Sequence, residues 1–245
     1  MRSKKNKIQI VLLLIICFLL AVYLFVILKD DIHTYFEQKR TVTVYLIRHG
    51  QTEANVNNIN VGGGSDSPLT DTGITESQKL GTFLKDIKFQ NAYSSELKRA
   101  VTTESLVLSQ NNYWDSENKE IITMSGLDDI NLGNAENLPL SDAVAQYGTE
   151  VTDFGNADDQ NFVPVTGGEN KYTFIQRFDH AMKKIVETEE NHGKNVIVAA
   201  HSSASFWLQK KFPYLKDNGL KNDSYTILTY DGDEFSLISY NNSAN

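Results

Sequence analysis

An arginine and a histidine stand next to each other in this chain, directly after a run of apolar residues. The run 42–47 is rich in β-branched side chains and is followed by Arg48, His49 and Gly50. This pattern predicts a buried strand that brings both side chains to its carboxyl end, where the glycine lets the backbone turn. Open α/β sheets bind ligands at the carboxyl ends of their strands. A histidine beside a permanently charged guanidinium is suited to attack on a bound phosphate.

Two further residues have the chemistry to complete such a site. His201 follows the apolar run 196–200, which is typical of a strand buried on both faces. Arg99 lies in the first turn of a helix predicted over residues 96–110, whose amino end also favours anions. A guanidinium fork binds phosphate oxygens in pairs. Taken singly, each residue also has an ordinary explanation, a histidine with structural hydrogen bonds or an arginine on a helix surface.

Five segments of the chain, in order, resemble the histidine phosphatase superfamily, which has the phosphoglycerate-mutase-like fold. The resemblance covers roughly residues 42–210. The segments are Arg48-His49-Gly50 with Asn55 six residues after the histidine, residues 66–73 (DSPLTDTG), residues 93–102 (YSSELKRAVT), residues 126–133 (GLDDINLG) and residues 196–201 (VIVAAH).

The resemblance implies a role for each matching residue. His49 would attack the phosphoryl group and form a phosphohistidine, which water then hydrolyses. Asp129 would protonate the leaving alkoxide as a general acid. His201 would also stabilise charge in the transition state. The phosphate would be bound by Arg48, Asn55, Arg99 and His201, with orientation of His49 as the other role open to Asn55.

The chain departs from the family pattern at two positions. Asp129 aligns with a residue that is usually glutamate, and its shorter side chain changes the reach of the proton donor; Asp128 and Glu136 are alternative donors. Ser202 stands where the family usually has glycine, so its hydroxyl either adds a phosphate contact or narrows the pocket. Glu169 is interpreted as a helix residue that suits the helix dipole, outside the site.

The first forty residues predict a membrane anchor. Residues 8–28 carry no charge and one polar side chain, Gln9. A helix of this length spans about 31 Å, close to the hydrocarbon thickness of a bilayer. Four basic residues precede it, which predicts a cytoplasmic amino terminus and a catalytic domain outside the cytoplasm. The alternatives are a cleaved signal peptide and a lipoprotein site at Cys17, which the preceding Ile16 disfavours.

These features divide the chain into a basic cytoplasmic tail (1–7), a transmembrane signal anchor (8–28), a tether (29–40) and a histidine phosphatase-like catalytic domain (41–245). The predicted location is the cell membrane, as a single-pass protein with an extracytoplasmic domain.

Cys17 is the only cysteine, so the outer domain forms no intramolecular disulfide. After the tail, 19 basic residues face 31 acidic ones. This balance excludes nonspecific nucleic-acid binding.

Alternating strand and helix patterns predict a three-layer α/β/α sandwich with a mainly parallel mixed sheet. This domain follows the single transmembrane helix. Residues 55–68 are expected to form a flexible loop, residues 126–168 a mostly irregular segment with a helix near 139–147, and Ser94 and Ser95 a cap for the next helix. Strands are predicted at 41–48, 89–93, 120–124, 196–200, 225–230 and 234–240, and helices at 71–86, 96–110, 169–190 and 203–212.

The sequence therefore predicts a membrane-anchored phosphatase that hydrolyses phosphomonoesters outside the cytoplasmic membrane. Its partners would be a phosphorylated small-molecule or envelope substrate and the membrane itself. No metal spacing, Walker loop or dinucleotide fingerprint occurs, so no cofactor is implied. Two other functions stay open at this point, a phosphoglycerate-type mutase and a catalytically weak phosphate-binding module.

Overall fold

The structure is a computed structural model that describes residues 15–26, 40–155, 158–215 and 219–244. The chain divides into two units, residues 1–40 and 41–245, and residues 15–26 of the first unit are helical. No helix of the described residues has the length and apolar character needed to cross a membrane. The predicted span 8–28 lies partly outside these residues, so the anchor stays a prediction.

Residues 41–245 are built on one mixed β-sheet, whose strands in the described part have the order β3-β2-β4-β1-β5-β6. The first four of these run parallel, and β5 and β6 add an antiparallel hairpin beside β1. The pairing of β5 with β6 shifts register at two places, and β3 is only three residues long. The strands are β1 (Val42–Arg48), β2 (Phe89–Ser94), β3 (Ile121–Thr123), β4 (Asn195–Ala200), β5 (Tyr225–Tyr230) and β6 (Phe235–Asn242).

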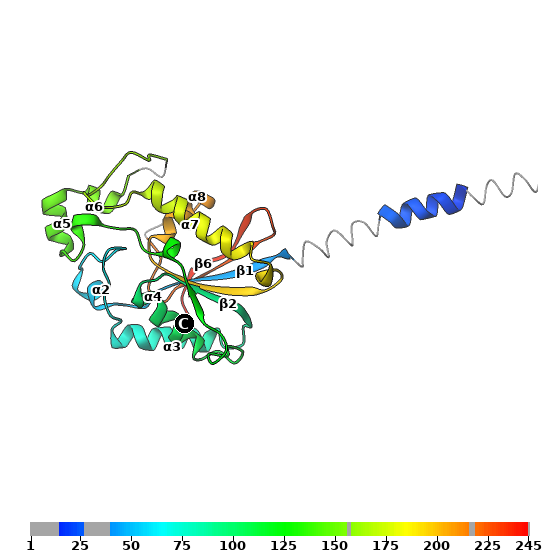
Figure 1. Cartoon of the computed structure of the whole chain (residues 1–245), viewed down its shortest axis with the longest axis horizontal. Helices are drawn as coiled ribbons and strands as arrows, with labels where there is room; N and C mark the ends of the chain where they lie inside the picture. Colours follow the sequence, from blue (N-terminus) through cyan, green and yellow to red (C-terminus); the bar gives the residue numbers. More distant parts are fainter. Residues whose placement is uncertain (1–14, 27–39, 156–157, 216–218, 245) are drawn as a thin grey trace, which may run out of the picture. The chain divides into compact units, whose positions relative to one another are not determined.

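Helices cover both faces of the sheet, as Figure 1 shows. The helices α3 (Asp71–Phe83) and α4 (Lys98–Leu108) lie on one face, and α7 (Lys171–Val186) and α8 (Ala204–Lys211) on the other. Side chains alternate between the two cores along β1, because Leu46 belongs to the core under α7 and α8, and Ile47 to the core under α3 and α4. The predicted α/β fold with a mixed, mainly parallel sheet is confirmed.

Several predicted boundaries differ from the structure. The loop expected at 55–68 begins with a helix, because Thr52 and Asn55 form a reciprocal capping box at its amino end. The long helix expected to reach residue 190 ends at Val186. The remaining short elements are α2 (Glu53–Asn57), α5 (Leu140–Tyr147), α6 (Glu150–Asp153) and three 3₁₀ turns, Ser125–Leu127, Gly133–Ala135 and Glu189–Asn191.

The serine pair was expected to cap α4, and this prediction is wrong. The helix begins at Lys98, later than predicted, and Leu97 at its cap position makes no side-chain bond. Instead, the carboxylate of Asp66 accepts the Lys98 N–H at 2.5 Å. Ser95 instead hydrogen-bonds His201, as described below.

Glu104 of α4 is a carboxyl group fully buried in the domain. Neither of its oxygens has a hydrogen-bond partner of normal geometry among the described residues. Burial raises the pKa of this carboxyl well above its ordinary value, and a backbone contact at Tyr93 opposes the rise only in part. The folded state therefore favours the protonated form.

Replacing Glu104 by methionine should stabilise the protein at alkaline pH. Because the pKa in the folded state lies above that in the unfolded state, stability is lost as pH rises between the two values. We expect Glu104→Met to raise the free energy of unfolding at pH 8 by about 1–3 kcal/mol and to flatten its fall between pH 5 and 8. Urea unfolding at both pH values measures this. Glu96→Met, at an exposed position, is the control, and an unchanged pH slope in Glu104→Met would contradict the expectation.

Candidate active site

The register of the parallel strands brings the two histidines together. Arg48 of β1 pairs with Ala200 of β4, so the next residues, His49 and His201, leave neighbouring strands at the same edge of the sheet. The backbone N–H of His49 donates to the Ala200 carbonyl at 3.0 Å. The two imidazole rings have centroids 5.2 Å apart, and both side chains are buried. The carboxyl-end site predicted from the sequence thus has both histidines at its centre.

The tautomer of His49 follows from its hydrogen bond. Nδ1 lies 2.8 Å from the carbonyl oxygen of Gly50. Since a carbonyl only accepts, Nδ1 carries the proton and Nε2 keeps the lone pair. Burial, with His201 and Arg48 nearby, holds the pKa of His49 well below its usual value. His49 is therefore a neutral imidazole with a free nucleophilic nitrogen.

Close packing around residue 50 leaves room only for glycine. A Cβ at this position would lie 2.9 Å from the carbonyl oxygen of Gly73 and 2.8 Å from Oγ of Ser77. A larger residue would push the strand end and the histidine before it out of place.

The tautomer of His201 is fixed by Ser95. The Ser95 hydroxyl donates to Oδ1 of Asp128 at 2.7 Å and accepts the N–H of Leu97 at 3.1 Å. Its single proton is used, so Nε2 of His201, at 2.7 Å from Ser95 Oγ, must be the donor. Burial, then Arg99 and Arg48, lower the pKa of His201 well below the usual value. Its Nδ1 has to take up a proton before it can donate to a phosphoryl oxygen.

Arg99 is buried, and a network of acceptors fixes its guanidinium. One terminal nitrogen donates to the Ser65 carbonyl at 3.0 Å and to Asp66 at 3.1 Å. The other donates to the Gly62 carbonyl at 3.0 Å and to Asp129 at 3.2 Å. The 62–66 loop therefore sets the direction of this side chain, and Asp129 occupies the N–H group on its active-site side.

The guanidinium of Arg48 has an N–H donor without an acceptor among the described residues. One of its terminal nitrogens donates to the carbonyl of Leu220. Its Nε is buried and has no hydrogen-bond partner among the described residues. Burial lowers the pKa of Arg48 to about 10, which leaves it charged at neutral pH. A half-buried cation with an unused donor beside His49 is suited to bind an anion.

Asp129 is a carboxylate that lies against both Arg99 and His201. Its Oδ2 accepts from Arg99 and lies 3.7 Å from Nδ1 of His201, and its Oδ1 accepts from the hydroxyl of Ser203. The two alternative donors are engaged elsewhere. Asp128 accepts from Ser95 and from a backbone N–H, and Glu136 accepts three backbone N–H groups and the Ser65 hydroxyl. The geometry favours Asp129 among the three.

Asn55 and Ser202 both contact other residues of the domain. The side-chain oxygen of Asn55 accepts from Thr52 and from Asn222, which also donates to the His49 carbonyl at 3.0 Å. A direct contact of Asn55 with phosphate stays a prediction. The hydroxyl of Ser202 lies against Gly219, where a Cβ would be 2.6 Å from it. Ser203, the next residue, binds Asp129 instead.

Comparison with known proteins decides the family. Residues 44–243 match the profile described as "Histidine phosphatase superfamily (branch 1)". The chain belongs to this superfamily. No group of three or more metal-ligating side chains occurs in the described part of the chain.

Relatives in the superfamily are both mutases and phosphatases. The chain is 31% identical to a 2,3-bisphosphoglycerate-dependent phosphoglycerate mutase of Cytophaga hutchinsonii over 65% of this chain and 71% of the other. It is 29% identical to a broad-specificity phosphatase of Saccharomyces cerevisiae, covering 82% and 85%. The crystal structure of a Bacillus anthracis phosphoglycerate mutase superposes with a TM-score of 0.72 at 27% identity, covering 84% and 95%. These relatives support phosphatase or mutase activity.

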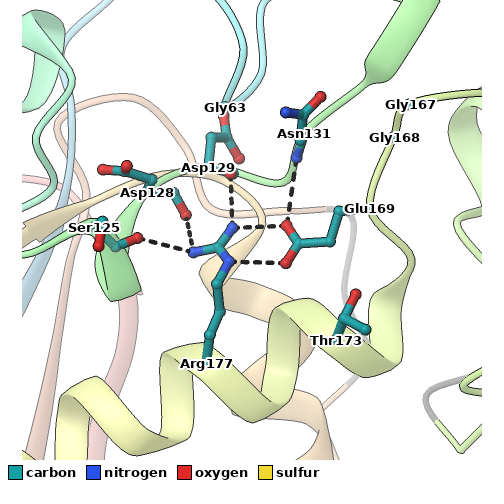
Figure 2. Close-up of a pocket in the computed structure, with 10 residues that line it drawn as sticks. All are labelled: Gly63, Ser125, Asp128, Asp129, Asn131, Gly167, Gly168, Glu169, Thr173 and Arg177. Atoms are coloured by element: carbon teal, nitrogen blue, oxygen red, sulfur yellow. Dashed lines mark hydrogen bonds and ion pairs between the residues drawn. The ribbon is translucent and has the colours of Figure 1, made fainter.

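The sequence did not predict a set of supporting contacts at this histidine phosphatase superfamily site, which Figure 2 shows. Arg177 of α7 forms a bidentate ion pair with Glu169, through Nε at 2.8 Å and a terminal nitrogen at 2.7 Å. It also donates to the carbonyls of Ser125, Gly126, Asp128 and Asp129. One side chain therefore holds the whole segment that carries the candidate proton donor.

Ser95 and Ser203 were also missed as site residues. Ser95 lay within a segment that resembles the family, but nothing in the sequence distinguished a hydroxyl bound to His201 from a helix cap. Ser203 and Arg177 gave no local signal for their contacts with Asp128 and Asp129, because these partners lie more than forty residues away in sequence.

Replacing Arg177 should slow this superfamily member without removing its substrate site. Arg177→Met deletes the four bonds from Arg177 to the 125–129 segment, so the backbone that carries Asp129 is held less firmly, while Arg99 and Ser203 still bind its carboxylate. A misplacement of about 1 Å costs on the order of 100-fold in rate. We expect kcat for alkyl phosphates to fall about 10–100-fold with KM changed less than about threefold.

Steady-state kinetics measure this split, and Arg177→Lys should restore part of kcat. Lys183→Met, on the same helix and ion-paired with Asp179, is the matched control. A rise in KM with kcat unchanged would show that Arg177 contributes to binding rather than to positioning.

Proposed function

We propose that this protein is a phosphatase that hydrolyses phosphomonoesters through a phosphohistidine on His49. The observation that carries this proposal is the state of His49. It is buried and neutral, and its Nε2 lone pair lies beside two cationic side chains, Arg48 and Arg99. A neutral nitrogen nucleophile next to fixed cations is what attack on a phosphate dianion requires.

Substrate binding would also prepare the proton donor. Asp129 occupies an N–H group of Arg99, and a phosphate dianion would compete for that group. Once displaced from Arg99, the Asp129 carboxyl is free to act as the general acid toward the departing oxygen. The same dianion favours proton uptake at Nδ1 of His201, so that this nitrogen can donate to a phosphoryl oxygen.

The reaction then proceeds in two steps. Nε2 of His49 attacks phosphorus, the P–O bond to the leaving group breaks, and the carboxyl of Asp129 gives its proton to the departing oxygen. In the second step water attacks the phosphohistidine and the P–N bond breaks. The Asp129 carboxylate takes the water proton, and inorganic phosphate is released with His49 restored.

The surroundings favour a phosphatase over a mutase. A phosphoglycerate-type mutase would hold a small acid carboxylate close to the transferred phosphate, which calls for cations beside the site. Beyond the arginines at the phosphate position, the pocket next to Asp129 and Ser203 is lined about equally by apolar and polar side chains, with Lys171 as the only lysine or arginine among the described residues that line it.

An assay of both activities tests the proposal. The full-length protein in detergent should release phosphate from p-nitrophenyl phosphate across pH 4–9 and should not interconvert 3- and 2-phosphoglycerate in the presence of 2,3-bisphosphoglycerate. Interconversion without phosphate release would establish the mutase. A protein that binds phosphate but turns nothing over would establish the weak binding module.

We also propose that the amino-terminal segment anchors the protein in the cell membrane with residues 41–245 outside the cytoplasm. The apolar run 8–28 and the basic residues before it support this. The test uses Cys17→Ser with Ser116→Cys at an exposed position. A membrane-impermeant maleimide should label this cysteine in intact cells. Labelling only after lysis would place the domain in the cytoplasm.

A further inference from the structure

A pocket of about 670 Å³ opens beside the reacting groups and continues along α8. Asp129 and Ser203 belong to its lining, so it adjoins the place where the ester oxygen leaves. Ser203, Phe206 and Gln209 of the same lining follow at helical spacing. At 1.5 Å per residue, the pocket therefore runs about 9 Å along the helix from the reacting end. This volume is within the range of small-molecule sites.

Apolar and polar side chains contribute about equally to the lining of this pocket, and the aromatic ones are fixed by packing. Phe206 lies 5.7 Å from Phe154 between ring centroids and meets Phe174 edge-on at 6.1 Å. Val151, buried in the domain core, and Leu140 also contribute to the lining. An aromatic or aliphatic body placed against these side chains would be removed from water, which favours binding.

One cation faces this apolar space. Nζ of Lys171 lies 4.7 Å from the centroid of the Phe206 ring, and the Lys171 backbone N–H donates to the Phe154 carbonyl at 3.0 Å. No carboxylate among the described residues forms an ion pair with it. By contrast, three other lysines of α7 and α8 are each paired with an aspartate: Lys183, Lys210 and Lys211.

The two charged side chains that line the pocket therefore lie at different distances from the reacting end. Its other charged lining residue, Asp129, is already paired with Arg99 at the reacting end. Phe206 lies one helical turn further along α8 than Ser203, and the ammonium group lies over its ring. An anion carried by the substrate would meet Lys171 beyond the apolar stretch and would replace a cation–π contact by an ion pair.

We propose that this pocket binds the leaving group of the substrate, and that the substrate is the phosphomonoester of a long amphipathic alcohol or phenol whose far end is anionic. The phosphate lies at His49, the apolar body lies along Phe206 and Phe154, and the distal anion pairs with Lys171. The proposal rests on the phosphatase function above.

A matched pair of alkyl phosphates tests the pairing. Octyl phosphate and 8-phosphooctanoate share a chain about 9 Å long at ordinary bond lengths and differ in the terminal carboxylate. Wild-type protein should favour 8-phosphooctanoate in kcat/KM by about tenfold, as for a partly desolvated ion pair. Lys171→Met should bring the two substrates to within about twofold of each other. Phe206→Ala should lower kcat/KM for both about tenfold.

Two controls separate this pairing from general effects. Lys210→Met, on α8 and ion-paired with Asp158, should keep the preference, and Phe83→Ala, an exposed aromatic of α3, should leave both rates unchanged. Equal rates on the two substrates in wild type, or a preference that survives Lys171→Met, would overturn the role of Lys171.

Failure of the pocket and failure of the phosphatase give different results. Release of phosphate from p-nitrophenyl phosphate without turnover of either octyl substrate would overturn the leaving-group pocket and leave the phosphatase intact. If p-nitrophenyl phosphate is also inert, calorimetric binding of 8-phosphooctanoate to wild type and Lys171→Met decides the pocket alone. Equal affinities would then overturn it.

Discussion

Replacing His49 by asparagine should lower kcat/KM for p-nitrophenyl phosphate at least about 10⁴-fold, because Nε2 of His49 supplies the attacking lone pair. Asparagine keeps a polar group at the strand end, so the fold should be retained. The wild type should form a covalent phosphoenzyme within one turnover, and the variant should form none.

Rapid quenching in alkali followed by mass spectrometry detects this intermediate, since phosphohistidine is stable in base. His180→Asn, at an exposed position on α7, is the control and should behave as wild type. A phosphoenzyme in His49→Asn would place the nucleophile on another residue.

Replacing Asp129 by asparagine should have an effect that depends on the leaving group. An alkoxide needs a proton as it departs, so kcat/KM for alkyl phosphates should fall about 10²–10⁴-fold. p-Nitrophenolate is stable without a proton, so formation of the phosphoenzyme from p-nitrophenyl phosphate should fall less than about tenfold. The pre-steady-state burst of nitrophenolate reports that step separately from hydrolysis of the phosphohistidine, in which Asp129 acts as the base.

Asp129→Glu restores the carboxyl with one more methylene and should recover part of the alkyl phosphate activity. Asp142→Asn, at an exposed position of α5, controls for the loss of one negative charge. An equal loss on both substrate classes in Asp129→Asn would show that this residue holds Arg99 in place rather than donating a proton.

The centre of the site could be predicted from sequence because it depends on strand ends. Each histidine ends an apolar run, and parallel pairing of two such runs leaves the residues after them as neighbours. The layers of the fold could also be predicted, since the periodicity of apolar residues shows which faces of the strands and helices are buried.

The supporting contacts could not be predicted, because their partners are brought together only by folding. The serine pair before α4 fits a helix cap in sequence, yet in space Ser95 lies beside His201 and a better acceptor takes its proton. Arg177 has the helical position of a surface charge, and only the packing of α7 against the 125–129 segment gives it four carbonyls to bind.

The two margins of the sheet bear on how copies of this protein behave at high concentration. An open sheet margin with a long regular row of free N–H and C=O groups invites a strand from another molecule. Here one margin is the three-residue β3, and the other is β6, whose pairing with β5 is broken by two register shifts. Such irregularities bend and twist a strand, so neither margin offers an even template. Crowded copies of this domain should therefore resist association through shared β-structure.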